Sequence, residues 1–177
     1  MIEKSQADAA ALKRLRDEID TADADLIRAI GTEQGNGEFA AARVEFTRAF
    51  QRLFGGNTQA TQEAAHLLHT LEQNLPRPPS GTAIRALLRG FAARARVRMH
   101  KNVTRDLDRE AAVTNTWKQN AEVSGVDPAT AVAIFQMILA TSIRMQELQI
   151  QGTLAACKEK EASAKQSGNS APHIICT

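Results

Sequence analysis

The apolar residues of this chain recur at helical spacing, and this periodicity limits the possible folds more than any other feature of the sequence. Between residues 10 and 30 the apolar positions step by three and four, while the opposite face is charged, which is typical of an amphipathic helix. Tyrosine is absent, and no long run shows the alternation of β-branched residues that half-buried strands need. The 177 residues therefore predict a single all-α domain. The apolar positions of this first helix are Leu12, Leu15, Ile19, Ala22, Leu26 and Ile30.

Glycine and proline divide the helical pattern in the first half of the chain. Glycines between residues 31 and 37 end the first helix, and Gly55 and Gly56 separate two predicted helices over 38–54 and 58–75, which would form a hairpin. Residues 76–81 read PRPPSG. This segment cannot continue a helix, because proline lacks the amide donor and clashes with the preceding turn. The sequence therefore predicts a helical hairpin followed by a linker.

Three more helices are expected in the second half. Helical spacing resumes over residues 82–100, and Asp106 is a suitable N-cap for a helix that ends near residue 124. An aspartate followed by proline then starts a helix that we expect to run from residue 128 to about 160. Residues 161–177 lack a periodic apolar pattern, so we expect one domain over residues 1–160 and a mobile C-terminal tail.

Composition excludes several classes of function. The net charge is +2, from 22 basic and 20 acidic residues, so the chain as a whole has no field that demands nucleic acid. No run of about 18 apolar residues predicts a membrane span, and the first 30 residues do not resemble a signal peptide. Two cysteines, Cys157 and Cys176, are too few for a disulfide framework, so we expect a reduced, cytoplasmic protein unless a signal was removed. His66 and His69 lack a third metal ligand nearby in sequence.

The segment over residues 85–105 carries more positive charge than any other stretch of the chain. At about 100° per residue, Arg85, Arg89 and Arg96 share one face of a helix, and Arg94 points nearly the other way with Arg98. A solvated basic face, or a helix that contacts phosphates, would also account for this pattern. The basic residues of the segment are Arg85, Arg89, Arg94, Arg96, Arg98, Lys101 and Arg105.

Two further groups of residues are candidates for a site. Asp106, Arg109 and Glu110 fall at i, i+3 and i+4 in the first turns of a helix, although carboxylates there are also favoured by the helix dipole. In the last helix, Ser142 and Gln146 lie on the same stripe as Phe135 and Leu139. A glutamine on a buried stripe needs hydrogen-bond partners, so this stripe is the more informative of the two groups.

Taken together, these segments resemble the all-helical AroQ chorismate mutases. The family's first helix opens with a pattern like LxxLRxxID, and residues 12–30 read LKRLRDEIDTADADLIRAI. The family carries a DxxRE signature, and residues 106–110 read DLDRE. Its last helix follows an LDP-like turn and carries a phenylalanine, a serine and a glutamine, which here are Phe135, Ser142 and Gln146. The spacing fits the family without a gap over residues 106–146.

The resemblance implies a cofactor-free rearrangement of chorismate to prephenate in an AroQ-like bundle. Arg16 and Arg85 would bind the two substrate carboxylates, with Ser142 near one of them. Arg96 and Gln146 would donate to the ether oxygen, although the family has a lysine where Arg96 stands, and arginine is bulkier. Glu110 would accept from the ring hydroxyl, and Asp106 and Arg109 would help to place it.

The same resemblance implies an unusual first helix. Residues from about 33 to 83, which include the predicted hairpin, interrupt what the family builds as one continuous long helix. In the family the arginine that corresponds to Arg16 comes from a partner protomer, which implies a homodimer, but the insertion could deliver it differently.

Three other functions remain open from the sequence. An isochorismate-pyruvate lyase would use the same fold and a closely similar site. A catalytically silent helical protein that serves as an interaction module would keep the scaffold alone. Nucleic-acid binding through residues 85–105 would leave Gln146 unexplained, so we expect neither a nucleic-acid nor a membrane partner.

Overall fold

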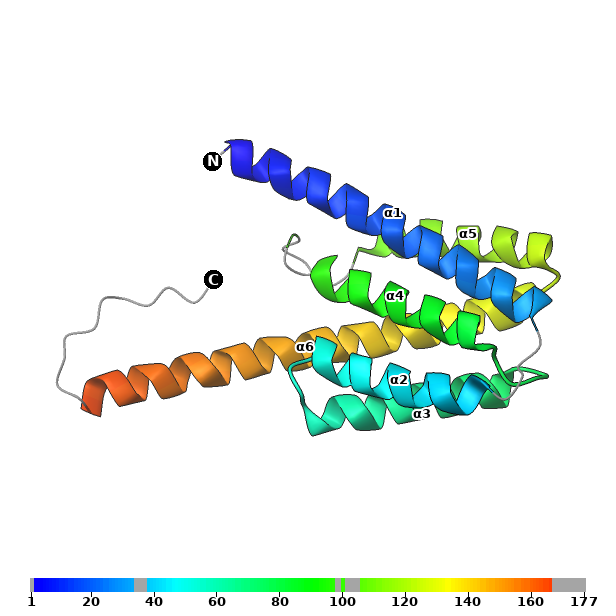
Figure 1. Cartoon of the computed structure of the whole chain (residues 1–177). Coiled ribbons are helices and arrows are strands. Elements are labelled where there is room, and N and C mark those ends of the chain that lie inside the picture. Colours follow the sequence, from blue (N-terminus) through cyan, green and yellow to red (C-terminus); the bar gives the residue numbers. More distant parts are fainter. Residues whose placement is uncertain (1, 34–37, 98–99, 101–105, 167–177) are drawn as a thin grey trace.

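The computed structural model describes residues 2–33, 38–97, 100 and 106–166, and within them the chain is helical, without a β-strand. The prediction of an all-α fold is confirmed. The helices form a bundle from which the ends of the first and last helices project at the same side (Figure 1). In chain order the helices are α1 (Ile2–Thr32), α2 (Glu38–Leu53), α3 (Thr58–Asn74), α4 (Gly81–Val97), α5 (Leu107–Ser124) and α6 (Pro128–Gln166).

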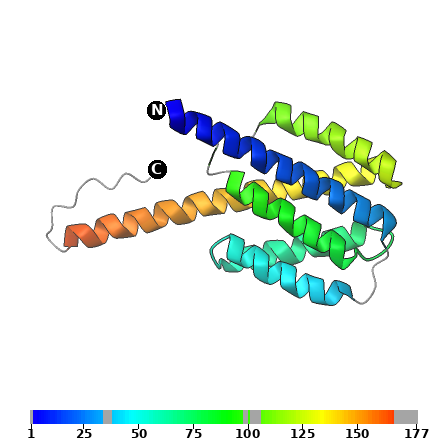
Figure 2. The same cartoon turned by 45° about the horizontal axis from the view of Figure 1, so that its top comes forward.

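Helices α1 and α4 pack side by side and run in opposite directions. Their ion pairs show the direction: Glu18 of α1 accepts from Arg96 of α4 at 2.8 Å, and Asp25, further along α1, accepts from the earlier Arg89 at 2.9 Å. Residue numbers thus rise along α1 as they fall along α4. Figure 2 shows the same antiparallel pair from a second direction. Helix α4 therefore returns along α1 and does not extend it.

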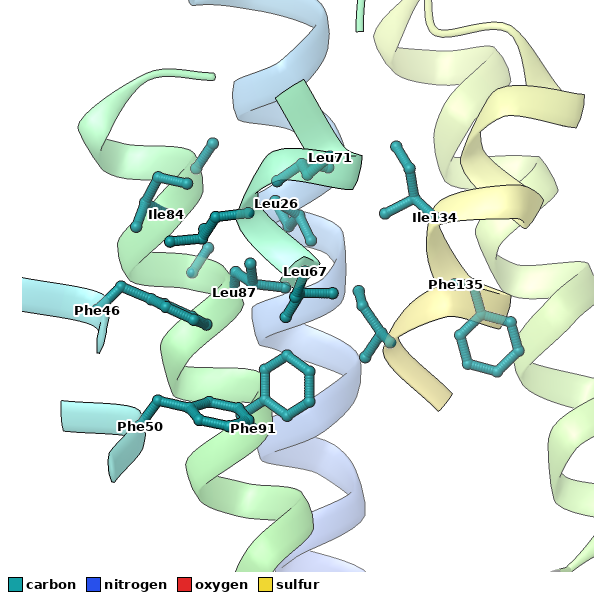
Figure 3. Packing of buried hydrophobic residues seen from close by; sticks show 14 of the residues in the cluster. Leu26, Phe46, Phe50, Leu67, Leu71, Ile84, Leu87, Phe91, Ile134 and Phe135 are labelled. Atoms are coloured by element: carbon teal, nitrogen blue, oxygen red, sulfur yellow. The ribbon is translucent and has the colours of Figure 1, made fainter. Parts of the chain in front are cut away.

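Helices α2 and α3 form the predicted hairpin, and its apolar side covers α4 and α6. Phe46 and Phe50 lie one turn apart on α2, are at most 1% exposed, and stack with ring centroids 5.5 Å apart. Phe91 of α4 meets Phe50 edge-on at 5.2 Å, an arrangement that aromatic quadrupoles favour. Figure 3 shows this cluster continuing into leucines of α1 and α3. The hairpin is thus an integral part of one hydrophobic core.

The caps that the sequence predicts define the helix ends around α5. The Asp106 side chain accepts from the backbone N–H of Arg109 at 3.0 Å and starts α5. Gly125 ends α5 in the left-handed conformation, with φ of 72°. Asp127 then accepts from the backbone N–H of Thr130 at 2.9 Å, and α6 begins at Pro128. These boundaries agree with the predicted ones, whereas α1 begins at Ile2 and not near residue 10.

Helix α6 continues beyond the bundle. Its side chains are buried at intervals as far as Gln146, and no described side chain after that residue is buried. Figures 1 and 2 both show the C-terminal part of α6 standing apart from the other helices. The helix ends at Gln166, which corrects its expected end near residue 160 and makes the first part of the predicted tail helical. The rest of that tail, residues 167–177, lies outside the described residues.

Helix α6 bears on two predictions from the sequence, that the cysteines are reduced and that no stretch could span a membrane. Cys157 is disulfide-bonded, so the prediction that both cysteines are reduced is wrong for this residue. An 18-residue window within the stretch Pro128–Ser163 has a mean hydropathy of 1.3, so α6 could cross a membrane by length and composition alone, contrary to the sequence prediction. Core helices of soluble proteins meet the same criterion, and one face of the first half of α6 is buried in the bundle, with Ile134 and Ile138 at most 1% exposed.

Candidate functional site

A cavity of about 100 Å³ lies between α1, α4, α5 and α6. One wall is apolar and comes mainly from α6 and α5. The other side carries arginines and carboxylates from α1, α4 and the start of α5. Such a mixture of apolar surface and a few convergent polar groups is typical of a small-molecule site. The cavity is lined by Arg16, Ile19, Arg94, Val97, Asp106, Arg109, Glu110, Val113, Phe135, Leu139, Ser142, Ile143 and Gln146.

The most buried charge in the cavity wall is Arg94. Its guanidinium donates to both carboxylate oxygens of Asp23, with Nη1–Oδ1 and Nη2–Oδ2 distances of 3.1 and 2.8 Å. Asp23 also accepts from the indole Nε1 of Trp117 at 3.1 Å. Arg94 is 9% exposed and Asp23 is 4% exposed. Burial without a partner would be costly for either charge, so the pair fixes both side chains.

The other two arginines lie at the rim, where side chains are about one third exposed. Arg16 of α1 donates to Asp106 at 2.9 Å, and the same carboxylate caps α5. Arg109 of α5 donates to Asp20 of α1. These two ion pairs tie the middle of α1 to the first turn of α5. They hold Glu110, the next residue of α5, at the cavity wall.

Ser142 and Gln146 are buried polar residues on the α6 wall, each 5% exposed. The Gln146 Nε2 group donates to the Arg94 carbonyl oxygen at 3.4 Å, a long contact. Neither Ser142 Oγ nor Gln146 Oε1 has a hydrogen-bond partner among the described residues. Leaving a buried polar atom unpaired costs about 1–3 kcal/mol, so two such atoms beside a cavity indicate a place for a polar ligand.

The lining arginines offer several hydrogen-bond donors to an anionic ligand with several oxygens. Each lining arginine has a carboxylate partner, and the partners of Arg94 and Arg109 are outside the set of lining residues. A paired guanidinium keeps further N–H groups that can donate to a second carboxylate. Arg94 and Arg109 can therefore donate to ligand oxygens while their ion pairs hold them in place, whereas Arg16, whose partner Asp106 also lines the cavity, can exchange that partner for a ligand carboxylate.

The structure brings most of the predicted site residues together. From the set proposed on sequence, the cavity is lined by Arg16, Asp106, Arg109, Glu110, Ser142 and Gln146. Phe135 and Leu139, which share the α6 stripe with the last two, line it as well. The predicted stripe on α6 therefore faces the cavity as expected.

The structure does not bring Arg85 and Arg96 to this cavity. Both are exposed and neither lines the cavity; the Arg96 side chain is 58% exposed and pairs with Glu18. The reason is that α4 turns the face with Arg94 toward the cavity, and Arg85 and Arg96 lie on the opposite face. Arg98, Lys101 and Arg105 lie outside the described residues.

Sequence reasoning missed Arg94 and Asp23, although both left a signal. Arg94 lies on the apolar stripe of α4, three and four residues from Phe91 and Gly90. Asp23 lies beside Ala22 on the apolar stripe of α1. A charged residue on an otherwise apolar stripe must be paired or functional when the stripe is buried. Trp117 packs beside this pair, with its ring centroid 5.5 Å from that of Phe135.

Arg16 reaches the cavity from the same chain that supplies Gln146. Because α4 folds back along α1, Arg16 and Arg94 face one cavity from two antiparallel helices of a single chain. Delivery of Arg16 within one chain, one of the alternatives left open by the sequence, is thus geometrically possible.

Metal binding receives no support in the described part of the chain. Among those residues no group of three or more His, Cys, Asp or Glu side chains could hold a metal ion, and His66 and His69 lie on α3, away from the cavity lining. The polar groups of the cavity are thus arginines, carboxylates, a hydroxyl and an amide.

Comparison with protein-family models, with curated proteins and with solved structures finds no match for this chain.

Proposed function

We propose that this protein is a chorismate mutase of the AroQ type. The observation that carries the proposal is the pair of unpartnered buried atoms, Ser142 Oγ and Gln146 Oε1, on one wall of a cavity that three arginines also line. The Ser142 hydroxyl can donate to an oxygen of a small dianion, whereas Gln146 Oε1 is an acceptor and calls for a ligand hydroxyl or a bound water. Chorismate has two carboxylates, an ether oxygen and a ring hydroxyl, and so matches this set of donors and acceptors.

The rearrangement asks little of the protein beyond binding and electrostatics. The ether C–O bond breaks as a new C–C bond forms within the same molecule, so neither a nucleophile nor a proton transfer is required. The protein holds a compact conformer and stabilises the charge that develops on the ether oxygen. Arginines and an amide are the residue types that supply these effects.

The geometry revises the roles that the sequence suggested. Arg94 takes the place of Arg85 and binds one substrate carboxylate deep in the cavity, near Ser142. Arg16 binds the other carboxylate at the rim, and it leaves Asp106 to do so. Fork-shaped guanidinium groups suit this work because they bind carboxylates with two parallel hydrogen bonds.

The amide of Gln146 donates to the ether oxygen. One of its N–H groups points to the Arg94 carbonyl, and the second serves the ligand. Glu110 accepts from the ring hydroxyl, with Arg109 beside it. Arg96 has no part in the site, so Gln146 carries the ether-oxygen role alone.

Because α4 returns along α1, the proposed active site is built within one chain. In the AroQ family a partner protomer supplies the arginine that corresponds to Arg16. In our proposal α1 and α4 correspond to the two halves of the family's long first helix, and the α2–α3 hairpin reverses the chain between them. The antiparallel contact that two protomers make in the family is then made within one chain, and a homodimer is not required for catalysis.

The direct experiment is to incubate the purified protein with chorismate and to follow prephenate formation. Turnover by the wild type, lost in Gln146→Ala while circular dichroism and thermal midpoint are retained, would support the proposal. A parallel incubation with isochorismate tests the lyase, which would yield salicylate and pyruvate. Absence of prephenate in the first incubation would refute the mutase proposal, whatever the second one gives.

A further inference from the structure

Asp23 holds Arg94 with more contacts than an ion pair alone requires. Its two oxygens accept two hydrogen bonds from the guanidinium and one from Trp117. The three residues that take part are all buried. The bidentate contact fixes the plane of the guanidinium, and the indole fixes the carboxylate in turn. Trp117 is itself 1% exposed and packs against Phe135 of the cavity wall.

The backbone around this pair is also shaped to fit it. A Cβ placed on Gly90 would lie 2.8 Å from Arg94 Nη1, 3.4 Å from Asp23 Oδ1 and 3.8 Å from Ala22 Cβ. Glycine and alanine at this point let α4 approach α1 closely enough for the guanidinium to lie against the helix. Any larger residue at position 90 would push the Arg94 head group out of its present place.

We propose that Asp23, steadied by Trp117, is a positioning residue that orients Arg94 toward a carboxylate of the ligand. This inference rests on the proposed function, since it assigns Arg94 to a substrate carboxylate. Asp23 does not line the cavity, so it acts through Arg94 and not on the ligand itself. A buried ion pair adds little stability compared with apolar residues of the same volume, so a need for one guanidinium orientation accounts for this pair better than fold stability does.

The expected signature is a change in KM and not in kcat. Asp23→Asn keeps an oxygen that can accept from Trp117 or from Arg94 but removes the bidentate acceptor. Arg94 would then bind the carboxylate less well in the ground state and the transition state alike, which raises KM and leaves kcat nearly unchanged. We expect KM for chorismate to rise roughly tenfold to a hundredfold, the range for a charge-assisted hydrogen bond. A role in folding alone would lower the active fraction, and with it kcat, without moving KM.

Gly90→Ala tests the same idea by a steric route that leaves every charge in place. The added methyl group displaces the guanidinium, so KM should rise severalfold while the thermal midpoint stays near that of the wild type, because alanine favours the helix more than glycine does. Gly152→Ala is the matched control: Gly152 is exposed on α6, and a Cβ there would meet nothing within 4 Å. It should leave KM and kcat unchanged.

The double variant Asp23→Asn/Gly90→Ala tests whether the two substitutions raise KM through the same residue, Arg94, or independently of each other. If both changes act through Arg94, KM of the double variant will be close to that of Asp23→Asn alone and well below the product of the two effects. Should Asp23→Asn fail to fold, the Gly90→Ala result decides, and an unchanged KM there overturns the inference.

The outcomes for the two proposals differ. An active wild type with unchanged KM in Asp23→Asn overturns the positioning role and leaves the mutase proposal standing. A wild type without chorismate turnover overturns the mutase proposal, and the positioning role falls with it.

Discussion

Replacing Gly31 by alanine should destabilise the protein, because the end of α1 lies against the backbone that joins α5 to α6. A Cβ built on Gly31 would lie 2.1 Å from the carbonyl oxygen of Ser124 and 3.1 Å from Val126 Cγ2. Neither the oxygen nor its carbon, 3.1 Å away, belongs to a flexible side chain that could turn aside. The last turn of α5 must therefore move away from α1 to accept the methyl group.

The magnitude follows from the size of this clash. The carbonyl has to retreat by roughly 1 Å, which belongs to the upper part of the usual overpacking range of about 1–3 kcal/mol. Alanine returns a few tenths of a kcal/mol through its better helix propensity, since Gly31 is in the final turn of α1. We expect a net loss of about 2 kcal/mol in the free energy of unfolding. For a chain of this size that loss lowers the thermal midpoint by roughly 4–8 °C.

The assay is thermal unfolding followed by circular dichroism at matched protein concentration. Gly152→Ala provides the same chemical change on an exposed helical surface with no neighbour within 4 Å, and it should raise the midpoint by about 1–4 °C. A Gly31→Ala protein as stable as the wild type, or more stable, would refute the close approach of α1 to the α5–α6 turn. That approach matters for the site, because the same helix delivers Arg16 and Asp20 to α5.

Four further outcomes are expected for the site. Gln146→Ala should lower kcat for chorismate by about a hundredfold or more and leave much of the substrate binding intact, because a donor to the developing charge is lost; steady-state kinetics measure this. Gln146→Glu should be active toward low pH alone, because only a protonated carboxyl can donate to the ether oxygen, and a flat pH–rate profile would contradict the role. Arg94→Ala should raise KM for chorismate by more than Asp23→Asn does, because the carboxylate loses its guanidinium partner altogether, whereas Arg96→Ala should change kcat/KM by less than about threefold, since Arg96 is exposed and paired outside the cavity. Finally, co-expressed Arg16→Ala and Gln146→Ala chains should show no recovered activity, whereas a site shared between protomers would restore about a quarter of the wild-type rate in a mixed dimer population.

Much of the secondary structure can be predicted because its signals are local. An N-cap aspartate, a proline in the first helical turn and a left-handed glycine each act within a few residues, and the ends of α5 and the start of α6 follow from Asp106, Gly125 and Pro128. Helix α6 ends at Gln166, shortly before the stop signals Gly168 and Asn169. The expected end near residue 160 is too early because it follows the loss of apolar periodicity and not these residues.

The site is predictable where one helix carries several of its residues. Spacing by three and four fixes which side chains share a face, so the sequence alone places Ser142 and Gln146 together. The face of α4 that carries Arg85 and Arg96 does not line the cavity; the sequence favours this face because the family resemblance matches these two residues to one continuous helix. The apolar stripe of α4, which includes Arg94, is the better guide to the cavity side.

The packing direction of α4 cannot be read from local spacing. Whether α4 continues α1 or returns along it depends on how the phenylalanines of α2 meet Phe91 and on the path of the proline-rich segment between α3 and α4. These are contacts between residues about forty positions apart. No pattern within a single helix determines them.

The antiparallel pairing of α1 and α4 also changes how the site depends on the amount of protein. When one chain carries both walls, the folded chain itself holds the Arg16 guanidinium at the cavity, whatever the protein concentration. Dilution cannot separate the two walls, so activity per molecule should remain constant down to nanomolar protein. Such an enzyme would keep its specific activity at low protein concentration. An enzyme whose site is shared between protomers does so only when the dissociation constant of the oligomer lies below the protein concentration.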